Sequence, residues 1–476
     1  MVSGDRPPRA VQAANRAFPA WGRVTADVRR EILYRFAQLL KENAASFDHM
    51  LRPKNAHLPL SSDKGPGEKI MPAIEAIKPV ISYDHNGPDY AQRYEEIAKD
   101  LLADSPVAWS DTYDGFWVIS RYADVKRIAD NWQLFSSENR AHEGDMTRRG
   151  IVVPPLPFPP PLNESDPPVH TKRRMIEAPY FTPKHLRRWQ EAAKTFTRIA
   201  IDDVIEKGEV EFVRDICLRI PAMTTLHVGG VDPQDWDLYA HPANYFEGDQ
   251  AAVYGQVIER LVGILLQRRD DPRDDIATAL ARATVEGDEP MDVHVAAGML
   301  HTIVTGGFDT AMSLLGNALE WMECNPQARD HLRAHPEAME NAVEEFLRNF
   351  PPVHHIARNV VEDIELSGQK LKAGDQVLMQ FYAANHDPEK FENPWEIRLD
   401  RPNARDHMAY SGGNHRCLGA PLARVEMRHI LNEVLRRMPD YRIDRNRAQR
   451  FEVFAPVHGW ARLPATFRPG PRSAPA

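Results

Sequence analysis

The pattern of hydrophobic positions predicts one very long helix in a mainly helical chain. Residues 291–325 contain no proline and predict a single helix of about eight or nine turns. That is far longer than the average helix of about 11 residues, so we expect it to cross the centre of a large domain. Residues 151–168, in contrast, are so rich in proline that they cannot form regular helix, and we expect a long irregular connection there.

Shorter apolar runs predict small sheets around this helix. Residues 116–120 have the composition of a strand, and a short helix is expected after them. Residues 355–382 hold short β-like runs that Gly368 and Gly374 divide. Near the C-terminus, residues 427–438 carry an apolar stripe at helical spacing. The predicted fold class is therefore mainly α with small β-sheets (α+β).

The N-terminal part differs in character from the rest. Residues 23–47 have helical apolar periodicity, and a polar linker rich in Pro, Ser and Lys follows them. We expect a partly helical extension at 1–80, a main domain at 81–470 and a disordered tail at 471–476. Residues 10–47 resemble the N-terminal helical region of aldehyde dehydrogenases, without the residues that those enzymes need for catalysis.

Composition excludes several classes of protein. The 476 residues include 59 Lys and Arg against 68 Asp and Glu, a net charge of -9, which argues against a nucleic-acid binder. The three cysteines lie far apart, so neither a disulfide framework nor a zinc cluster is indicated. No apolar run approaches the 18 or so residues of a membrane span, and the first residues lack a secretory signal. We therefore expect a soluble, cytoplasmic protein.

The strongest chemical signal is a cysteine between a glycine-rich turn and a helix. Residues 410–419 read YSGGNHRCLG, with Cys417 just before the predicted helix and Gly419 small enough for close approach of a flat ligand. Backbone N–H groups and the helix dipole favour a thiolate at such a position. An anionic sulfur of this kind is what a thiolate ligand to iron requires.

The spacing Y-x-x-G-x-H-x-C-x-G, from Tyr410 to Gly419, resembles the haem-ligand loop of the cytochrome P450 family. The family usually has Phe in place of Tyr410 and Gly in place of Ser411. The resemblance runs over about residues 80–470 and implies the cytochrome P450 fold of the bacterial soluble class. It also implies a bound haem b, with Cys417 as the metal ligand.

Two further segments extend the resemblance to the two sides of the haem. The sequence DPPVHTKRR places His170 and Arg174 on one face of a helix start, and the family's corresponding residues bind the haem propionates. The sequence TGGFDT resembles the oxygen-binding kink of the family's central helix, where Asp309 and Thr310 would be the catalytic pair that delivers protons. The residues expected to bind haem are His170, Arg174, Gly306, Arg358, Tyr410, His415, Cys417 and Gly419. Those expected to face the substrate are Thr302, Thr305, His354 and Ile356.

A third segment has a structural role in the family. Glu345 and Arg348 lie three apart on a predicted helix and can form an ion pair. By resemblance the pair is buried, and Arg401 joins it in bracing the core.

The implied reaction inserts one atom of O2 into a small hydrophobic substrate, such as a terpenoid or an aromatic compound. The chain has no dinucleotide-binding fingerprint and too few cysteines for an iron–sulfur cluster, so a separate ferredoxin with an NAD(P)H-dependent reductase is expected. We expect a monomer. Candidates for a basic docking surface are Lys172, Arg173, Arg187, Arg188, Arg416, Arg424 and Arg428.

Two alternative functions remain at this stage. The chain could be a haem-thiolate enzyme that uses peroxide or rearranges a substrate without O2, or it could be a non-catalytic haem-binding protein. The pair Asp309–Thr310 argues against both, because neither needs protons delivered to bound oxygen.

Overall fold

A computed structural model describes residues 79–141, 148–155, 159–240, 250–285, 290–452 and 457–473. They belong to one compact unit, Ile74–Ala476. The extension expected at 1–80 lies outside the described residues except for its last two positions, and so do the last three residues of the expected tail. No helix in the described part of the chain has the length and apolar character of a membrane span.

Helices dominate the described residues, as the hydrophobic pattern predicts. They are α4 (Pro88–Asp104), α5 (Tyr122–Asp130), α6 (Val169–Glu177), α7 (Pro183–Asp202), α8 (Arg219–Gly229), α9 (Trp236–Ala240), α11 (Gln250–Asp270), α12 (Ile276–Arg282), α13 (Val293–Cys324), α14 (Pro326–Ala334), α15 (Met339–Asn349), α16 (Phe381–Ala384) and α17 (Ala420–Arg437).

The strands are short. They are β1 (Val80–Ile81), β2 (Val107–Ser110), β3 (Phe116–Ile119), β4 (Phe135–Ser136), β5 (Arg140–Ala141), β6 (Arg148–Arg149), β7 (Glu209–Glu211), β8 (His355–Val360), β9 (Ile364–Leu366), β10 (Gln369–Leu371), β11 (Gln376–Gln380), β12 (Arg442–Ile443), β13 (Gln449–Arg450), β14 (Trp460–Arg462) and β15 (Pro464–Thr466). The prediction of a mainly helical fold with small sheets is confirmed.

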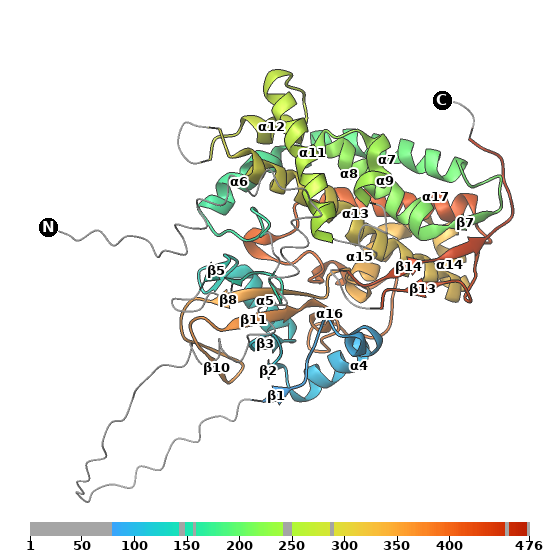
Figure 1. Cartoon of the computed structure of the whole chain (residues 1–476). Helices are drawn as coiled ribbons and strands as arrows, with labels where there is room; N and C mark the ends of the chain where they lie inside the picture. The colour runs from blue at the N-terminus through green and yellow to red at the C-terminus, as the bar shows by residue number, and fades with distance from the viewer. Residues whose placement is uncertain are drawn as a thin grey trace, which may run out of the picture. The chain divides into compact units, whose positions relative to one another are not determined.

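The predicted long helix is α13, which is about 48 Å long and packs against α8, α11 and α17 (Figure 1). It begins where the carboxylate of Asp292 accepts hydrogen bonds from the N–H groups of His294 and Val295, at 2.9 and 3.1 Å. It ends just before Asn325, because a residue that precedes proline disfavours the helical conformation. Most of its side chains are buried, so it forms the centre of the helical layer.

The largest sheet has six strands in the order β1-β2-β3-β11-β8-β4, and it lies beside the helical layer together with α4, α5 and α16 (Figure 1). β11 runs antiparallel to β8 and parallel to β3. The predicted divisions at Gly368 and Gly374 are confirmed, since both glycines turn the chain with φ of +81° and +89°. The face of β8 that carries Arg358 is held in place by this sheet.

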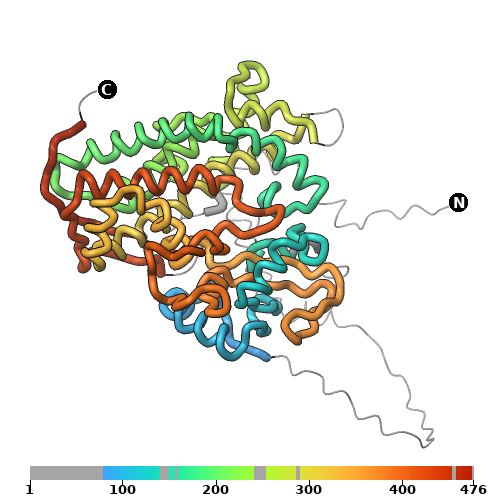
Figure 2. The backbone as a smooth tube through the Cα atoms, turned by 180° about the vertical axis from the view of Figure 1, so that it is seen from behind, coloured from blue at the N-terminus to red at the C-terminus, as the bar shows by residue number. Residues whose placement is uncertain are grey.

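The predicted amphipathic helix is α17, which lies alongside α7 and α15 (Figure 2). Pro421 sits in its first turn, where a missing N–H costs little. The apolar stripe is buried, from Met427 through Ile430 to Val434. Its packing fixes the start of the helix, and therefore the cysteine loop that precedes it.

The described parts of residues 151–168 contain no helix or strand, as predicted from their prolines. Two buried carboxylates fasten the end of this connection. Asp166 accepts hydrogen bonds from the Ser136 hydroxyl and from the N–H of Ser137, and Glu164 accepts one from the N–H of Ile151 at 3.0 Å. The chain therefore enters α6 from a fixed point.

Candidate functional site

The cysteine loop is a tight turn held by backbone hydrogen bonds, among them one from the N–H of Arg416 to the carbonyl of Gly413 at 3.2 Å. The N–H of Cys417 donates to the carbonyl of Tyr410 at 3.0 Å. Gly413 makes the turn possible, because its φ is +57° and a Cβ there would lie 2.3 Å from the carbonyl oxygen of Ala129. The glycine-rich sequence is thus required by the close approach of the loop to α5.

The thiol of Cys417 is placed for ligation. Its surface is accessible, yet neighbouring atoms surround it closely enough that burial raises the pKa of the thiol. The N–H groups of Gly419 and Ala420 and the charges of Arg174 and Arg424 act in the opposite direction. An accessible sulfur with helix N–H groups and cations beside it suits a bound iron, whose charge would favour the thiolate further.

The ring of Tyr410 packs against a network of polar side chains next to the cysteine loop. The guanidinium of Arg424 lies 4.6 Å from the ring centroid and pairs with Glu344 at 2.6 Å, and His407 contacts the same carboxylate at 3.2 Å. Although burial alone would raise it, these contacts lower the pKa of Glu344 to about 2. Sequence reasoning missed Glu344 and His407, because nothing in their spacing links them to the loop.

Four basic side chains that the sequence predicted for one site do come together. The rings of His170 and His415 lie 4.2 Å apart, and Arg174 donates to the carbonyl of Arg416 at 2.6 Å, beside the cysteine. Arg358 is only 4 % exposed, and its charge helps to lower the pKa of both His170 and His415, so it lies close to them. Burial lowers the pKa of Arg358 to about 10, of His170 to about 4 and of His415 to about 2.

No carboxylate of the described residues forms an ion pair with the arginines of this basic cluster. Among the described residues, no carboxylate lies within ion-pair distance of Arg174 or Arg358, and both ring nitrogens of His170 and the Nε2 of His415 have no hydrogen-bond partner. Buried cations and donors without partners are costly, so they indicate a bound group that brings negative charge. A haem, with its two propionates, fits these residues.

The central helix presents an open face. A Cβ at Gly306 would meet no atom within 4 Å, whereas one at Gly307 would lie 2.1 Å from Cγ2 of Thr225 on α8. The first glycine of the pair leaves space and the second allows two helices to touch. The helix runs without a break from Val293 to Cys324, so the kink that the resemblance implies does not interrupt it. The hydroxyl of Thr310 donates to the carbonyl of Gly306 at 2.9 Å. Burial raises the pKa of Asp309 to about 8.

Three of the four residues expected to face the substrate have suitable positions. Thr302 and Thr305 are partly exposed and share the helix face of Gly306 and Asp309, at spacings of three, four and seven residues. Ile356 is partly exposed and lies on the same face of β8 as Arg358, two residues away.

His354 is not placed with them, and the prediction for this residue is wrong. It is 1 % exposed, its Nδ1 contacts the hydroxyl of Tyr90 at 3.1 Å, and its ring stacks on Tyr382 at 4.7 Å. Its carbonyl accepts the N–H of Phe381, and this contact turns the residue toward α16 before β8 begins. A buried ring engaged on both sides offers no surface to a substrate.

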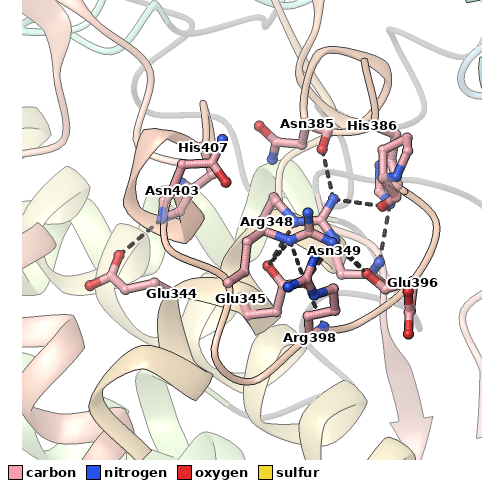
Figure 3. A network of polar contacts seen from close by, with 12 residues as sticks. Glu344, Glu345, Arg348, Asn349, Asn385, His386, Glu396, Arg398, Asn403 and His407 are labelled. Carbon is pink, nitrogen blue, oxygen red and sulfur yellow. Dashed lines mark hydrogen bonds and ion pairs between the residues drawn. The ribbon is translucent and has the colours of Figure 1, made fainter. Parts of the chain in front are cut away.

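The predicted structural network is present (Figure 3). The side chains of Glu345, Arg348 and Arg401 are at most 1 % exposed. Glu345 accepts two hydrogen bonds from Arg348, at 2.8 and 2.9 Å, and Arg401 donates to both of its oxygens at 3.0 Å. Arg348 also donates to the backbone carbonyls of Asn385, Pro394 and Glu396. The triad ties α15 to the segment before the cysteine loop.

Comparison with known proteins agrees with this geometry. The family model "Cytochrome P450" matches residues 251–439, and the model "Aldehyde dehydrogenase family" matches residues 5–64, which supports the resemblance seen at the N-terminus. Cytochrome P450 130 of Mycobacterium tuberculosis is 31% identical over 70% of this chain and 84% of its own length. Linalool 8-monooxygenase of Pseudomonas putida is 28% identical over 74% of this chain and 91% of its own.

Solved structures show the same fold. CYP108D1 from Novosphingobium aromaticivorans matches with a TM-score of 0.70 and 28% identity, covering 80% of this chain and 97% of that one. A mutant of P450 EryK in complex with erythromycin B matches with a TM-score of 0.71 and 26% identity, over 82% of this chain and all of the other. This chain therefore belongs to the cytochrome P450 family of haem-thiolate monooxygenases.

Proposed function

We propose that this chain hydroxylates a small hydrophobic substrate, with Cys417 as the thiolate ligand of haem b and with electrons from a ferredoxin. The observation that carries the proposal is the basic cluster of His170, Arg174, Arg358 and His415 beside the cysteine, which has no anion among the described residues. The two propionates of haem would supply that charge, and Gly306 and Gly419 leave room for a flat ring system.

Haem held by these residues would supply the activation of O2: with two electrons from the ferredoxin and two protons, one oxygen atom would enter the substrate and the other would leave as water. The chain's own residues control the protons that this reaction consumes. The carboxyl of Asp309, with a pKa of about 8, can both give and take a proton near neutral pH. The hydroxyl of Thr310 lies one residue further along the open face and can hold a water or an oxygen atom in place.

A hydrophobic substrate is supported by the residues of the open face and by the relatives. Ile356 and the methyl groups of Thr302 and Thr305 offer a largely apolar lining. One relative is a linalool 8-monooxygenase, and another, 30% identical, is the steroid C26-monooxygenase of Mycolicibacterium smegmatis. We infer a terpenoid or a substituted aromatic compound for this chain.

A ferredoxin would dock where basic residues remain free near the cysteine. Several predicted candidates are already engaged, since Arg424 pairs with Glu344 and Arg428 with Glu340. Arg416 is exposed in the cysteine loop itself. The exposed Met175 on α6, 64 % accessible, would give an acidic partner an apolar contact near it.

The test of the haem assignment is the spectrum of the reduced protein with carbon monoxide. We expect the red-shifted Soret band of thiolate-ligated haem, and we expect Cys417→Ala to abolish it. Cys324→Ala is the matched control, because Cys324 is an accessible cysteine at the end of α13. Retention of the band in Cys417→Ala would overturn the assignment.

A second test separates the monooxygenase from its alternatives. With ferredoxin, reductase and NAD(P)H, we expect Asp309→Asn to slow turnover by about 100-fold while haem stays bound. Turnover that peroxide supports and ferredoxin does not would favour a peroxide-using enzyme. An absence of NAD(P)H consumption with every substrate would favour a non-catalytic haem protein.

A further inference from the structure

The open face of α13 carries hydroxyl groups whose hydrogens are already engaged. Thr302 donates to the carbonyl of Gly298, and Thr305 donates to the carbonyl of His301, each at 2.9 Å. Thr310 does the same with Gly306. Each hydroxyl has one hydrogen and two lone pairs, so each of these oxygens can still accept a further hydrogen bond.

These oxygens differ in their surroundings from similar threonines elsewhere. Thr197 on α7 and Thr224 on α8 also donate to carbonyls four residues back, but both are buried among other side chains. Thr302 and Thr305 are partly exposed, and they lie on the face where a Cβ at Gly306 would meet no atom within 4 Å. A ligand bound against this face would therefore be able to donate hydrogen bonds to their oxygens.

We propose that the polar group of the substrate that contacts α13 is a hydrogen-bond donor, as in an alcohol, a phenol or an amine. Thr302 and Thr305 would be the specificity-determining residues. This inference rests on the proposed function, since it concerns the substrate of the same site.

The preference follows from what each kind of ligand leaves unpaired. A hydroxyl or amine can donate to the lone pairs of Thr302 or Thr305 without disturbing the helix. A ketone, aldehyde or ester has only acceptors, so it must either face another acceptor or draw a threonine hydrogen away from its carbonyl. One hydrogen bond of this kind corresponds to a difference of about twofold to tenfold in affinity.

The two threonines form one small subsite. Residues three apart on a helix lie about 5–6 Å from each other, so a single hydroxyl can reach either oxygen. Toward the N-terminal end the face is bounded, because a Cβ at Gly298 would lie 2.9 Å from Cγ of Pro161. We therefore expect the donor group of the substrate to lie beside the turn of α13 that holds Thr302 and Thr305, and away from Thr310.

The experiment uses the haem-loaded full chain and phenylimidazoles, which ligate haem iron through the imidazole whatever the natural substrate is. Three sets are compared, with a hydroxyl, a formyl group or no substituent, and the group is placed at each position of the phenyl ring. Dissociation constants come from the spectral shift on ligation. We expect the hydroxyl compound to bind at least several-fold more tightly than the formyl analogue substituted at the same ring position, where that position reaches α13.

Variants assign the preference to the two side chains. The double variant Thr302→Val and Thr305→Val keeps the shape of both side chains and removes their oxygens. In this variant we expect the preference in affinity for the hydroxyl compound over the formyl compound to be lost. Thr197→Val is the matched control and should leave the ratio unchanged.

The outcomes for the two proposals can be told apart. Equal affinities of the hydroxyl and formyl compounds at every ring position, or a ratio that survives in the double variant, would overturn this inference while the carbon monoxide band stays intact. Loss of the band itself, or of any spectral response to the imidazoles, would instead overturn the proposed haem site.

Discussion

The buried triad around Glu345 allows a sharp prediction for stability. Glu345→Gln keeps the shape of the side chain and removes the one negative charge between two guanidinium groups. Arg348 and Arg401, at most 1 % exposed, would then have no carboxylate of the described residues within ion-pair distance. Breaking a buried ion pair by removal of one partner costs about 3–5 kcal/mol, a large share of the roughly 5–15 kcal/mol that stabilises a typical domain.

The same helix supplies the control. Glu340 also contacts two arginines, Arg405 at 2.6 Å and Arg428 at 3.3 Å, but its side chain is 57 % exposed. Ion pairs of this kind contribute at most about 1 kcal/mol. Denaturant midpoints of the haem-loaded variants, followed by the Soret band and by circular dichroism, should therefore fall much further for Glu345→Gln than for Glu340→Gln. Equal losses in the two variants would refute the reasoning.

Three other predictions concern the fold around the site. Burial lowers the pKa of His386 and His458 to about 3, whereas histidine in an unfolded chain has a pKa of roughly 6.5. Between these values the unfolded state binds more protons, so the free energy of unfolding should fall as the pH drops from about 6.5 toward 3. A flat profile of unfolding midpoints against pH would contradict this. Gly307→Ala should destabilise by about 1–3 kcal/mol, because the new methyl group would meet Thr225, and Thr225→Ala in the same chain should restore much of the loss in a denaturation experiment. Ser411→Gly should stabilise by up to about 1 kcal/mol in thermal unfolding, since Ser411 has a φ of +55°, and a loss of stability would show that its side chain matters more than its backbone.

Local signals in the sequence were sufficient for the elements that carry the site. The absence of proline before Pro326 predicted α13 to within two residues, since chain chemistry alone decides where such a helix ends. The spacing of Glu345 and Arg348 predicted their pairing, and the resemblance to a known family added Arg401. These predictions depend on contacts within one helix or on motifs shared by many proteins.

Contacts between distant segments could not be predicted. The position of the His354 ring depends on Tyr90, which is 264 residues away in the chain. The residues around His354 in the sequence do not indicate that this tyrosine packs there. The two glycines of the central helix look equivalent in sequence, yet only the crossing of α8 decides that Gly307 packs and Gly306 stays open. The pairing of Glu344 with Arg424 likewise joins two helices 80 residues apart.

The ion pair between Arg424 and Glu344 affects how the protein binds an acidic partner. Its charge is balanced by Glu344, and its guanidinium lies over the ring of Tyr410, so it adds little to the field that a partner senses at a distance. A count of arginines near the cysteine loop therefore overstates the attraction. The rate of association with an acidic electron donor should depend on ionic strength less steeply than such a count suggests, because only exposed basic residues such as Arg416 contribute to long-range steering.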